Sequence, residues 1–204
     1  MPVEVWLIFV LSSLGILLVP GPTMLLVVGY TVMYGRTSAW VTVPAVTLAG
    51  GLALSLSMLG LDAIKQMSPV IFWLLKMAGA GYLLFLAANL WFAAGVEAGQ
   101  EKVVTQDARR RIFLNVFTVT ALNPKGLVFF IAFIPQFMAR STEGPVLWMT
   151  IEVTYMSLVA LVFLGYALLA AKAASLFKRQ AESALIPRCA AVMLATAAVA
   201  TAWI

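Results

Sequence analysis

Val19-Pro20-Gly21-Pro22-Thr23 and Leu122-Asn123-Pro124-Lys125-Gly126 interrupt two long apolar stretches of the chain, 5–34 and 112–138. At 1.5 Å per residue, unbroken helices of these lengths would be roughly 45 and 40 Å long, whereas the hydrocarbon core of a bilayer is roughly 30 Å thick. Proline has no N–H, and its ring clashes with the preceding turn of a helix. Each stretch is therefore predicted to form a helix that breaks near its middle.

The composition places the whole chain in the membrane. Of its 204 residues, 63% are hydrophobic and only 10% are charged, whereas a soluble domain carries about 25% charged residues. Backbone polar groups in lipid must find partners within their own segment, which favours helices. We therefore predict an all-α integral membrane protein that forms one transmembrane domain over residues 1–204.

Polar breaks between the apolar runs divide the chain into six predicted membrane spans, at 5–34, 39–61, 69–94, 112–138, 145–171 and 186–204. The two broken helices each open a group of three spans. This arrangement predicts two repeats, about 1–94 and 112–204, joined by a basic linker at 95–111. Because each repeat has an odd number of spans, the two copies would lie in opposite orientations.

Basic residues in the loops predict the orientation. Nine of them fall in alternate loops that would share one side: Arg36, Lys102, Arg109, Arg110, Arg111, Lys172, Lys178, Arg179 and Arg188. The opposite side has only Lys65 and Arg140. Because cytoplasmic loops are enriched in Lys and Arg, we predict a multi-pass protein of the bacterial inner membrane with both termini in the periplasm. The same distribution explains the net charge of +5 without nucleic-acid binding.

The composition also argues against several kinds of chemistry. The chain has no histidine and one cysteine, Cys189, so it offers neither a thiol pair nor a cluster of soft metal ligands. No Ser/Lys or Asp pair stands at a spacing that suggests an intramembrane enzyme. We therefore expect no enzymatic activity, no cofactor and no bound metal.

The second break reads as a helix start inside the membrane. Asparagine is a preferred N-cap residue and proline is favoured at the first helical position, which here are Asn123 and Pro124. The N–H groups of Lys125, Gly126 and Leu127 would then be free and point at one spot, at the positive end of the helix dipole. The alternative is a plain proline kink, which is common in membrane helices.

The first break offers the same arrangement. Gly21 would be the cap and Pro22 the first helical residue, so Thr23, Met24 and Leu25 would supply the free N–H groups. Helix starts near the middle of a bilayer suit an anionic group such as the carboxylate of an amino acid. Two breaks at matching positions favour a binding site over two unrelated kinks.

Two charged residues fall inside predicted spans near these breaks. An unpaired ammonium at Lys125 would be costly in lipid, and Glu152 in the fifth span is its candidate partner. Glu152 could instead carry a coupling proton or bind the ammonium of a substrate, with Tyr155 on the same helix face. Alternatively, Lys125 snorkels to an interface and Glu152 lies among the outer headgroups.

Three stretches of the chain form a recognisable set of motifs: Pro20-Gly21-Pro22 with Gly35 downstream, the segment 76–86 in the third span, and the fourth span with Asn123-Pro124-Lys125, Phe129-Phe130 and Pro135-Gln136-Phe137. Together they resemble the LysE/RhtB family of amino-acid exporters. The resemblance covers nearly the whole chain. It implies efflux of amino acids or their derivatives, driven by an ion gradient, with protons as the coupling ion and a homodimer as the assembly.

The chain departs from the family pattern at two places. Similar proteins often carry a polar or acidic residue just after a glycine in the second span, where this chain has Gly50-Gly51. Glu152 lies in the fifth span, the counterpart of the second under the predicted repeat, and we hypothesise that it replaces that residue. The fourth span has Asn115 where a glycine is usual.

The sequence thus predicts secondary-active export of a small neutral zwitterion by alternating access. The substrate carboxylate would meet the N–H groups at one break, and its ammonium would meet Glu152 or carbonyls freed at a break. The residues predicted to bind substrate are Gly21, Pro22, Thr23, Met24, Asn123, Pro124, Lys125, Gly126, Glu152 and Tyr155, and Glu152 and Lys125 are also predicted to couple transport. The alternative is a channel or transporter for small solutes or metal ions.

Overall fold

A computed structural model describes residues 2–59, 105–123, 125–127, 129–130 and 144–176, and the isolated positions 77, 81, 84, 85, 87, 88, 91, 192, 195, 196 and 199. Every regular element in this part of the chain is a helix. Apart from the isolated positions, the predicted third and sixth spans lie outside the described residues, as do Pro124, most of 128–143, Cys189 and most of the linker 95–111. The six-span repeat and its orientation therefore stay predictions.

The first predicted span is broken where its prolines stand. Helix α1 covers Val3–Leu18 and helix α2 covers Pro22–Tyr34, and their axes are bent by 59°. Between them, Val19 and Gly21 are extended, because two prolines in three residues remove the N–H groups that a continuing helix needs. This break was predicted from the sequence and is confirmed.

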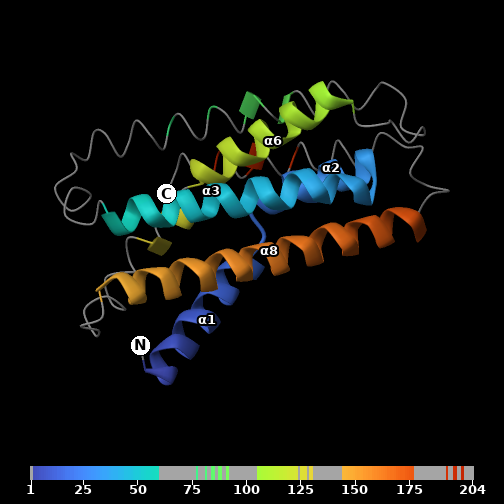
Figure 1. The fold of residues 1–204 in the computed structure, drawn as a ribbon. Helices are drawn as coiled ribbons and strands as arrows, with labels where there is room; N and C mark the ends of the chain where they lie inside the picture. Colours follow the sequence, from blue (N-terminus) through green and yellow to red (C-terminus); the bar gives the residue numbers. More distant parts are fainter. Residues whose placement is uncertain are drawn as a thin grey trace.

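Helix α1 leans away from the other helices at the N-terminal end of the chain (Figure 1). It packs against α8, which covers Gly144–Leu176. The indole N–H of Trp6 donates a hydrogen bond to the Thr154 hydroxyl over 3.1 Å. This contact joins the first span to the fifth.

A tight connection leads from α2 to the next long helix. Gly35 has φ +74°, a conformation that L side chains rarely adopt. The 3-10 turn η1, Arg36–Ser38, follows it, and helix α3 then covers Ala39–Leu59. The Ser38 side chain donates to the Gly35 carbonyl over 2.8 Å, so it fixes this turn.

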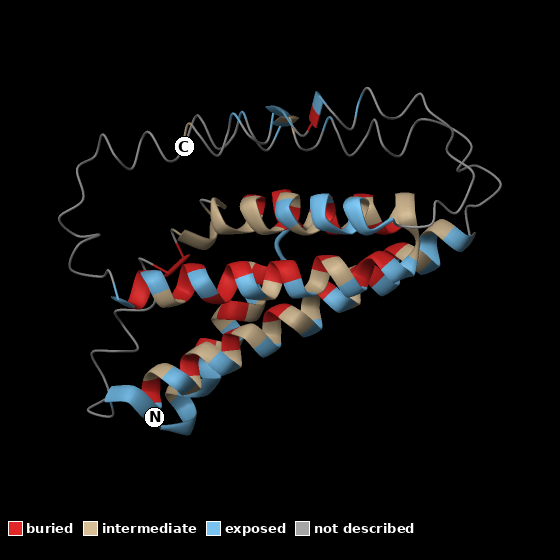
Figure 2. Cartoon of the chain, turned by 45° about the horizontal axis from the view of Figure 1, so that its top comes forward, coloured by how far each residue is buried: buried red, intermediate tan, exposed pale blue. Residues whose placement is uncertain are grey.

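Helix α3 lies in the centre of the described helices. It packs against both α8 and α6, which covers Gln106–Ala121, and all three are drawn side by side in Figures 1 and 2. Small residues line its buried face, where Ala45, Ala49, Gly50 and Ala53 let the neighbouring backbones come close. Figure 2 shows buried residues along the facing sides of these helices and exposed residues on their outer sides.

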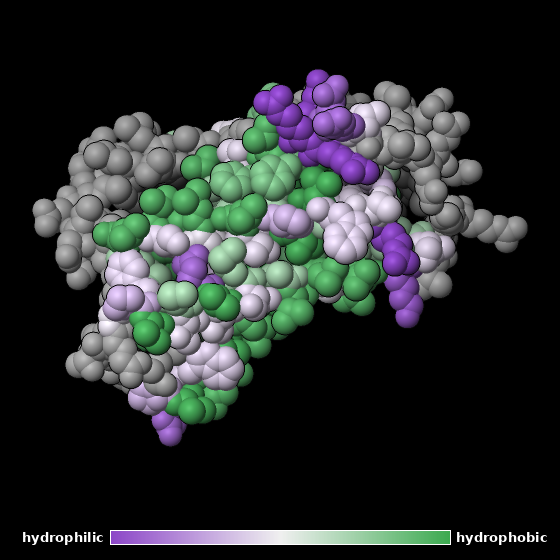
Figure 3. All heavy atoms as spheres, viewed as in Figure 1, coloured by the Kyte–Doolittle hydropathy of each residue, from purple (hydrophilic) through white to green (hydrophobic). Residues whose placement is uncertain are grey.

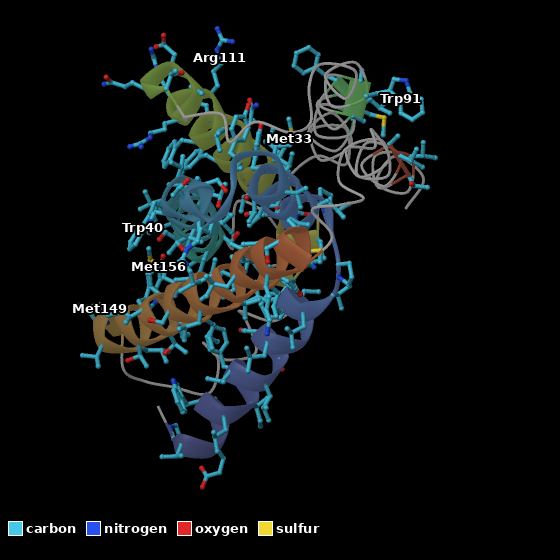
Figure 4. The ribbon with its side chains drawn as sticks, turned by 90° about the vertical axis from the view of Figure 1, so that its right-hand side faces the viewer. Met33, Trp40, Trp91, Arg111, Met149 and Met156 are labelled. Carbon is cyan, nitrogen blue, oxygen red and sulfur yellow. The ribbon has the colours of Figure 1, made fainter. Side chains whose placement is uncertain are left out.

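Helix α6 begins six residues before the predicted fourth span. The Thr105 side chain accepts a hydrogen bond from the Ala108 N–H over 3.3 Å and so caps the helix. Arg109, Arg110 and Arg111 follow in its first turns, near or at the surface. Figure 3 shows a hydrophilic patch at this end of α6, and Figure 4 shows Arg111 pointing away from the other helices. The predicted span therefore continues a helix that starts with a charged end.

Helix α8 is longer than the predicted fifth span of 145–171. It has 33 residues, roughly 50 Å of helix, so the helix continues into the segment between the predicted fifth and sixth spans. One face is buried at nearly every fourth residue, at Leu147, Ile151, Tyr155, Val159, Phe163, Ala167 and Ala170. The opposite face exposes large apolar side chains such as Val153, Leu161 and Leu169, as expected of a helix that faces lipid.

Two described helices are long and apolar enough to cross a membrane, and the bent pair α1–α2 makes a third candidate span. The two are α3 with the preceding η1 turn, and α8. The all-helical, apolar character predicted from the composition is confirmed. A protein with so much apolar outer surface requires a lipid environment.

Gly51 lets α3 and α8 approach each other, so replacing it with alanine should destabilise the protein. A Cβ atom at Gly51 would lie 2.9 Å from both Glu152 Oε1 and Met156 Sδ, and Figure 4 shows Met156 on the side of α8 that faces α3. Both atoms are near the flexible ends of their side chains, but Met156 Cγ would also lie only 3.2 Å away, so we expect a cost near the lower end of the about 1–3 kcal/mol of overpacking. We expect Gly51→Ala to lower the melting temperature of the purified protein.

Gly165→Ala in α8 is the matched control. A Cβ atom there meets nothing within 4 Å, and alanine stabilises a helix by up to about 1 kcal/mol relative to glycine. Gly165→Ala should therefore melt at or above the temperature of the unmodified protein. Equal melting temperatures for the two variants would contradict the close approach of α3 and α8 at Gly51.

Candidate functional site

The two proline breaks meet at one cavity. Its volume is about 50 Å³, and its walls come from both breaks, from α3 and from α8. Among the described residues, the polar side chains that line it are Thr23, Thr120, Asn123, Lys125 and Tyr155. Most of the remaining wall is apolar, with Val46, Ala53, Phe129, Phe130, Val159 and Phe163 among its residues.

Thr23 joins the two breaks. Its side chain is buried, and its Oγ1 accepts a hydrogen bond from Asn123 Nδ2 over 3.2 Å. The hydroxyl oxygens of Thr23 and Thr120 lie 3.4 Å apart. Because Thr120 donates its single hydroxyl proton to the Val116 carbonyl over 2.7 Å, the bond between the two threonines must use the proton of Thr23. Thr23 therefore bonds to two residues near the end of α6.

The second break is closed by its own cap residue. The Lys125 N–H donates to Asn123 Oδ1 over 3.1 Å, and the N–H groups of Gly126 and Leu127 donate to the Asn123 carbonyl over 3.1 and 3.2 Å. The prediction that these three N–H groups are free was wrong. Asn123 is a good N-cap because its side chain and carbonyl accept the first N–H groups of the helix, and those bonds leave no donor for an anion.

The first break has no such cap. Gly21 has no side chain to accept a hydrogen bond, and the first backbone bond of α2 runs from the Leu25 N–H to the Gly21 carbonyl over 3.0 Å. The N–H groups of Thr23 and Met24 precede that bond, where helix donors lack intrahelical acceptors. Among the described residues, the N–H groups of Thr23 and Met24 have no acceptor, and both residues line the cavity.

Lys125 reaches back to the first break. Its ammonium donates to the Val19 carbonyl over 2.5 Å, and a Cβ atom at Gly21 would lie 3.5 Å from Lys125 Nζ. Within the described residues, neither Glu152 nor any other carboxylate forms an ion pair with it. The candidate ion pair between Lys125 and Glu152 is therefore not formed, because the Lys125 ammonium bonds to the broken end of α1.

Tyr166 of α8 contacts the same broken end. Its hydroxyl lies 3.0 Å from the Leu18 carbonyl and 3.4 Å from the Leu17 carbonyl. Sequence analysis missed this residue. The signal that could have found it is its spacing from Tyr155, because positions 11 apart lie on nearly the same face of a helix.

Tyr155 and Glu152 have different surroundings. Tyr155 is 5% exposed and lines the cavity, where its ring packs edge-on against Phe130 with centroids 5.2 Å apart. Glu152 does not line the cavity. Its carboxyl group lies beside Gly51 of α3, with the Ser55 side chain as a hydrogen-bonding neighbour.

Seven of the ten residues predicted to bind substrate line this one cavity: Gly21, Thr23, Met24, Asn123, Lys125, Gly126 and Tyr155. Pro22 is buried at the start of α2 but does not line it, and Glu152 lies outside it. Pro124 lies outside the described residues. Thr120 lines the cavity and was not predicted, because an isolated threonine in an apolar helix gives no distinctive sequence signal.

Comparison with known proteins gives the family. A family model described as LysE type translocator matches residues 14–202. The chain is 30% identical over 178 residues to a homoserine/homoserine lactone efflux protein of Salmonella typhi. The aligned residues cover 87% of this chain and 86% of that protein. It is 25% identical over 161 residues to a leucine efflux protein of Salmonella choleraesuis, with 79% and 76% covered.

A leucine efflux protein of Klebsiella pneumoniae is 24% identical over 164 residues, which cover 76% of this chain and 77% of that protein. No solved structure matches the chain significantly. The resemblance seen at the two breaks and in the third span is confirmed by a match that spans nearly all residues. The chain belongs to the LysE type translocator family, whose members are transporters and not enzymes.

Proposed function

We propose that this protein is a secondary-active exporter of neutral amino acids or closely related small zwitterions across the bacterial inner membrane. The observation that carries the proposal is the cavity at which both proline breaks meet, lined by the uncapped start of α2 and by apolar side chains. The relatives are efflux proteins for homoserine, homoserine lactone and leucine by name.

The start of α2 is the proposed place for the substrate carboxylate. The N–H groups of Thr23 and Met24 lie there without a cap, at the positive end of the α2 dipole. Backbone N–H groups at a helix start are a general anion site. The N–H groups of Lys125 and Gly126, the other predicted binding site for the carboxylate, already donate their hydrogen bonds to Asn123.

The apolar wall favours an aliphatic substrate side chain. Val46 and Ala53 of α3 face the cavity, as do Val159 and Phe163 of α8. Among the described lining residues, Lys125 is the only one with a charged side chain. A second positive charge on the substrate would lack a counter-charge among these residues, so a neutral amino acid fits better than a dibasic one.

Glu152 is proposed as the coupling residue. Its carboxyl group lies beside Gly51, which is where the family resemblance expects a polar or acidic side chain from the second span. It reaches that place from α8 instead of α3. Since it lies outside the cavity, we assign it proton coupling and not contact with the substrate.

Alternating access is proposed because the cavity is small. About 50 Å³ is well below the roughly 300–1,000 Å³ of pockets that hold small molecules, so the helices must separate to admit a substrate. On the predicted cytoplasmic side of the cavity, the Asn115 side-chain amide donates to the Tyr30 hydroxyl over 2.9 Å. We propose that this contact between α2 and α6 opens when substrate enters from the cytoplasm.

Transport of an amino acid by the purified protein is the decisive measurement. In proteoliposomes loaded with unlabelled L-leucine or L-homoserine, we expect accelerated uptake of the labelled compound. Thr23→Val should slow this counterflow by at least about fivefold, because it removes both side-chain hydrogen bonds between Thr23 and the end of α6, each worth about 1 kcal/mol.

Thr150→Val is the matched control for Thr23→Val. The Thr150 hydroxyl bonds only to the Val146 carbonyl of its own helix among the described groups, so counterflow should stay unchanged. Uptake without any stimulation by internal substrate would indicate a channel and would overturn the proposal of a carrier.

Proton coupling is tested by Glu152→Gln. The amide keeps the shape of the side chain but cannot release a proton, so net export should lose its dependence on the pH gradient while counterflow persists. Glu4→Gln is the control, since Glu4 lies exposed in the first turn of α1. If Glu152→Gln exported substrate with an unchanged pH dependence, the coupling ion would not bind at this residue.

Restricting the contact between Tyr30 and Asn115 tests alternating access. In a protein carrying Cys189→Ser, the paired changes Tyr30→Cys and Asn115→Cys allow a bifunctional maleimide to join α2 and α6. Cross-linking should abolish counterflow, whereas each single cysteine treated with the same reagent should keep most of it. Full activity after complete cross-linking would show that α2 and α6 need not separate.

A further inference from the structure

The broken end of α1 presents carbonyl groups that have lost their helix donors. In a continuous helix, residues 20 and 22 would donate N–H bonds to earlier carbonyls, but both are proline and Gly21 is extended. The carbonyls of Leu18 and Val19 instead accept hydrogen bonds from the side chains of Tyr166 and Lys125, which belong to other helical segments. They also form the negative end of the α1 dipole.

These carbonyls have two different donors. Tyr166 contributes its one hydroxyl proton at the nearer Leu18 carbonyl, with the Leu17 carbonyl 3.4 Å away, and Lys125 contributes an ammonium at Val19. An ammonium has three protons to donate, and no described carboxylate neutralises it. The end of α1 therefore acts as the partner of a positive charge within the membrane.

The position of this charge is accessible from the cavity. Val19, Gly21 and Lys125 all line it, and Gly21 has no side chain that would cover the Val19 carbonyl. A small ammonium ion in the cavity could therefore reach the same carbonyl oxygen once the Lys125 head group moves away. The long stem of lysine allows such movement without a change in the backbone.

We propose that the broken end of α1 is a cation subsite for primary ammonium groups, and that Lys125 occupies it as a tethered stand-in for the ammonium of the transported molecule. The identification of that molecule rests on the proposed function, whereas the subsite itself would accept any small primary ammonium ion. When the ligand arrives, its ammonium replaces that of Lys125 at the Val19 carbonyl. The displaced Lys125 is then free to meet the carboxylate of the same ligand.

Chemical rescue of a truncated lysine tests the subsite directly. Lys125→Ala should lower the melting temperature of the full-length protein in nanodiscs, because the Val19 carbonyl loses its donor. Added methylammonium chloride should raise the melting temperature of this variant along a saturating curve, as a ligand that binds the folded state does. The unmodified protein, whose subsite is already occupied, should shift much less.

Two controls separate a specific site from a general salt effect. Tetramethylammonium chloride at equal concentration has no N–H donor, so it should not shift Lys125→Ala beyond sodium chloride. Leu127→Ala opens space beside the same cavity without freeing a carbonyl, so methylammonium should affect it no more than the unmodified protein. An unshifted Lys125→Ala, or an equal shift in Leu127→Ala, would overturn the subsite.

A second variant guards against a Lys125→Ala protein that does not fold. Lys125→Met keeps most of the apolar stem and removes only the charged head, and ammonium chloride replaces methylammonium as the probe because the remaining space is smaller. Failure of rescue in both variants, with leucine counterflow intact in the unmodified protein, would refute the subsite alone. Rescue without counterflow of any amino acid would keep the subsite and refute the proposed substrate.

Discussion

Backbone N–H and C=O groups inside a membrane need hydrogen-bond partners, because lipid offers none. Pro20 and Pro22 remove the partners that the end of α1 would have had in a continuous helix. The missing donors come from Lys125, just after the second break, and from Tyr166, near the far end of α8. The break in the first span thus brings the segment after the second break and helix α8 to the end of α1. The cavity lies beside this meeting point.

The two breaks solve this problem in different ways. At the second break, Asn123 accepts the first N–H groups of the following helix with its side chain and its carbonyl, so that helix start is complete in itself. At the first break, Gly21 has no side chain to cap the first N–H groups of α2, so their hydrogen-bond acceptors must come from elsewhere. A site for an exchangeable ligand belongs at the incomplete break, since a ligand there supplies bonds that the chain does not make with its own neighbours.

The sequence was sufficient for features that depend on local chemistry. Prolines at 20 and 22 predict the break between α1 and α2, and the apolar composition predicts the helices. The partners of Lys125 and Glu152 could not be predicted, because they depend on which side of α8 faces which helix. Opposite charges suggested an ion pair, but Glu152 is turned toward Gly51 and Ser55 of α3 while Tyr155, three residues later, faces the cavity.

Gly21 and Gly51 both lie beside the charged end of a side chain from another helical segment. A side chain at Gly21 would come within 3.5 Å of the Lys125 ammonium, and one at Gly51 within 2.9 Å of the Glu152 carboxyl oxygen. Each glycine therefore makes room beside its backbone for the charged end of a residue from another helix. Both charges lie at the end of several rotatable bonds, so each can change partner while its helix stays in place. In the proposed transport cycle, Lys125 and Glu152 change partner as substrate passes, and glycine at these two positions provides the space for that exchange.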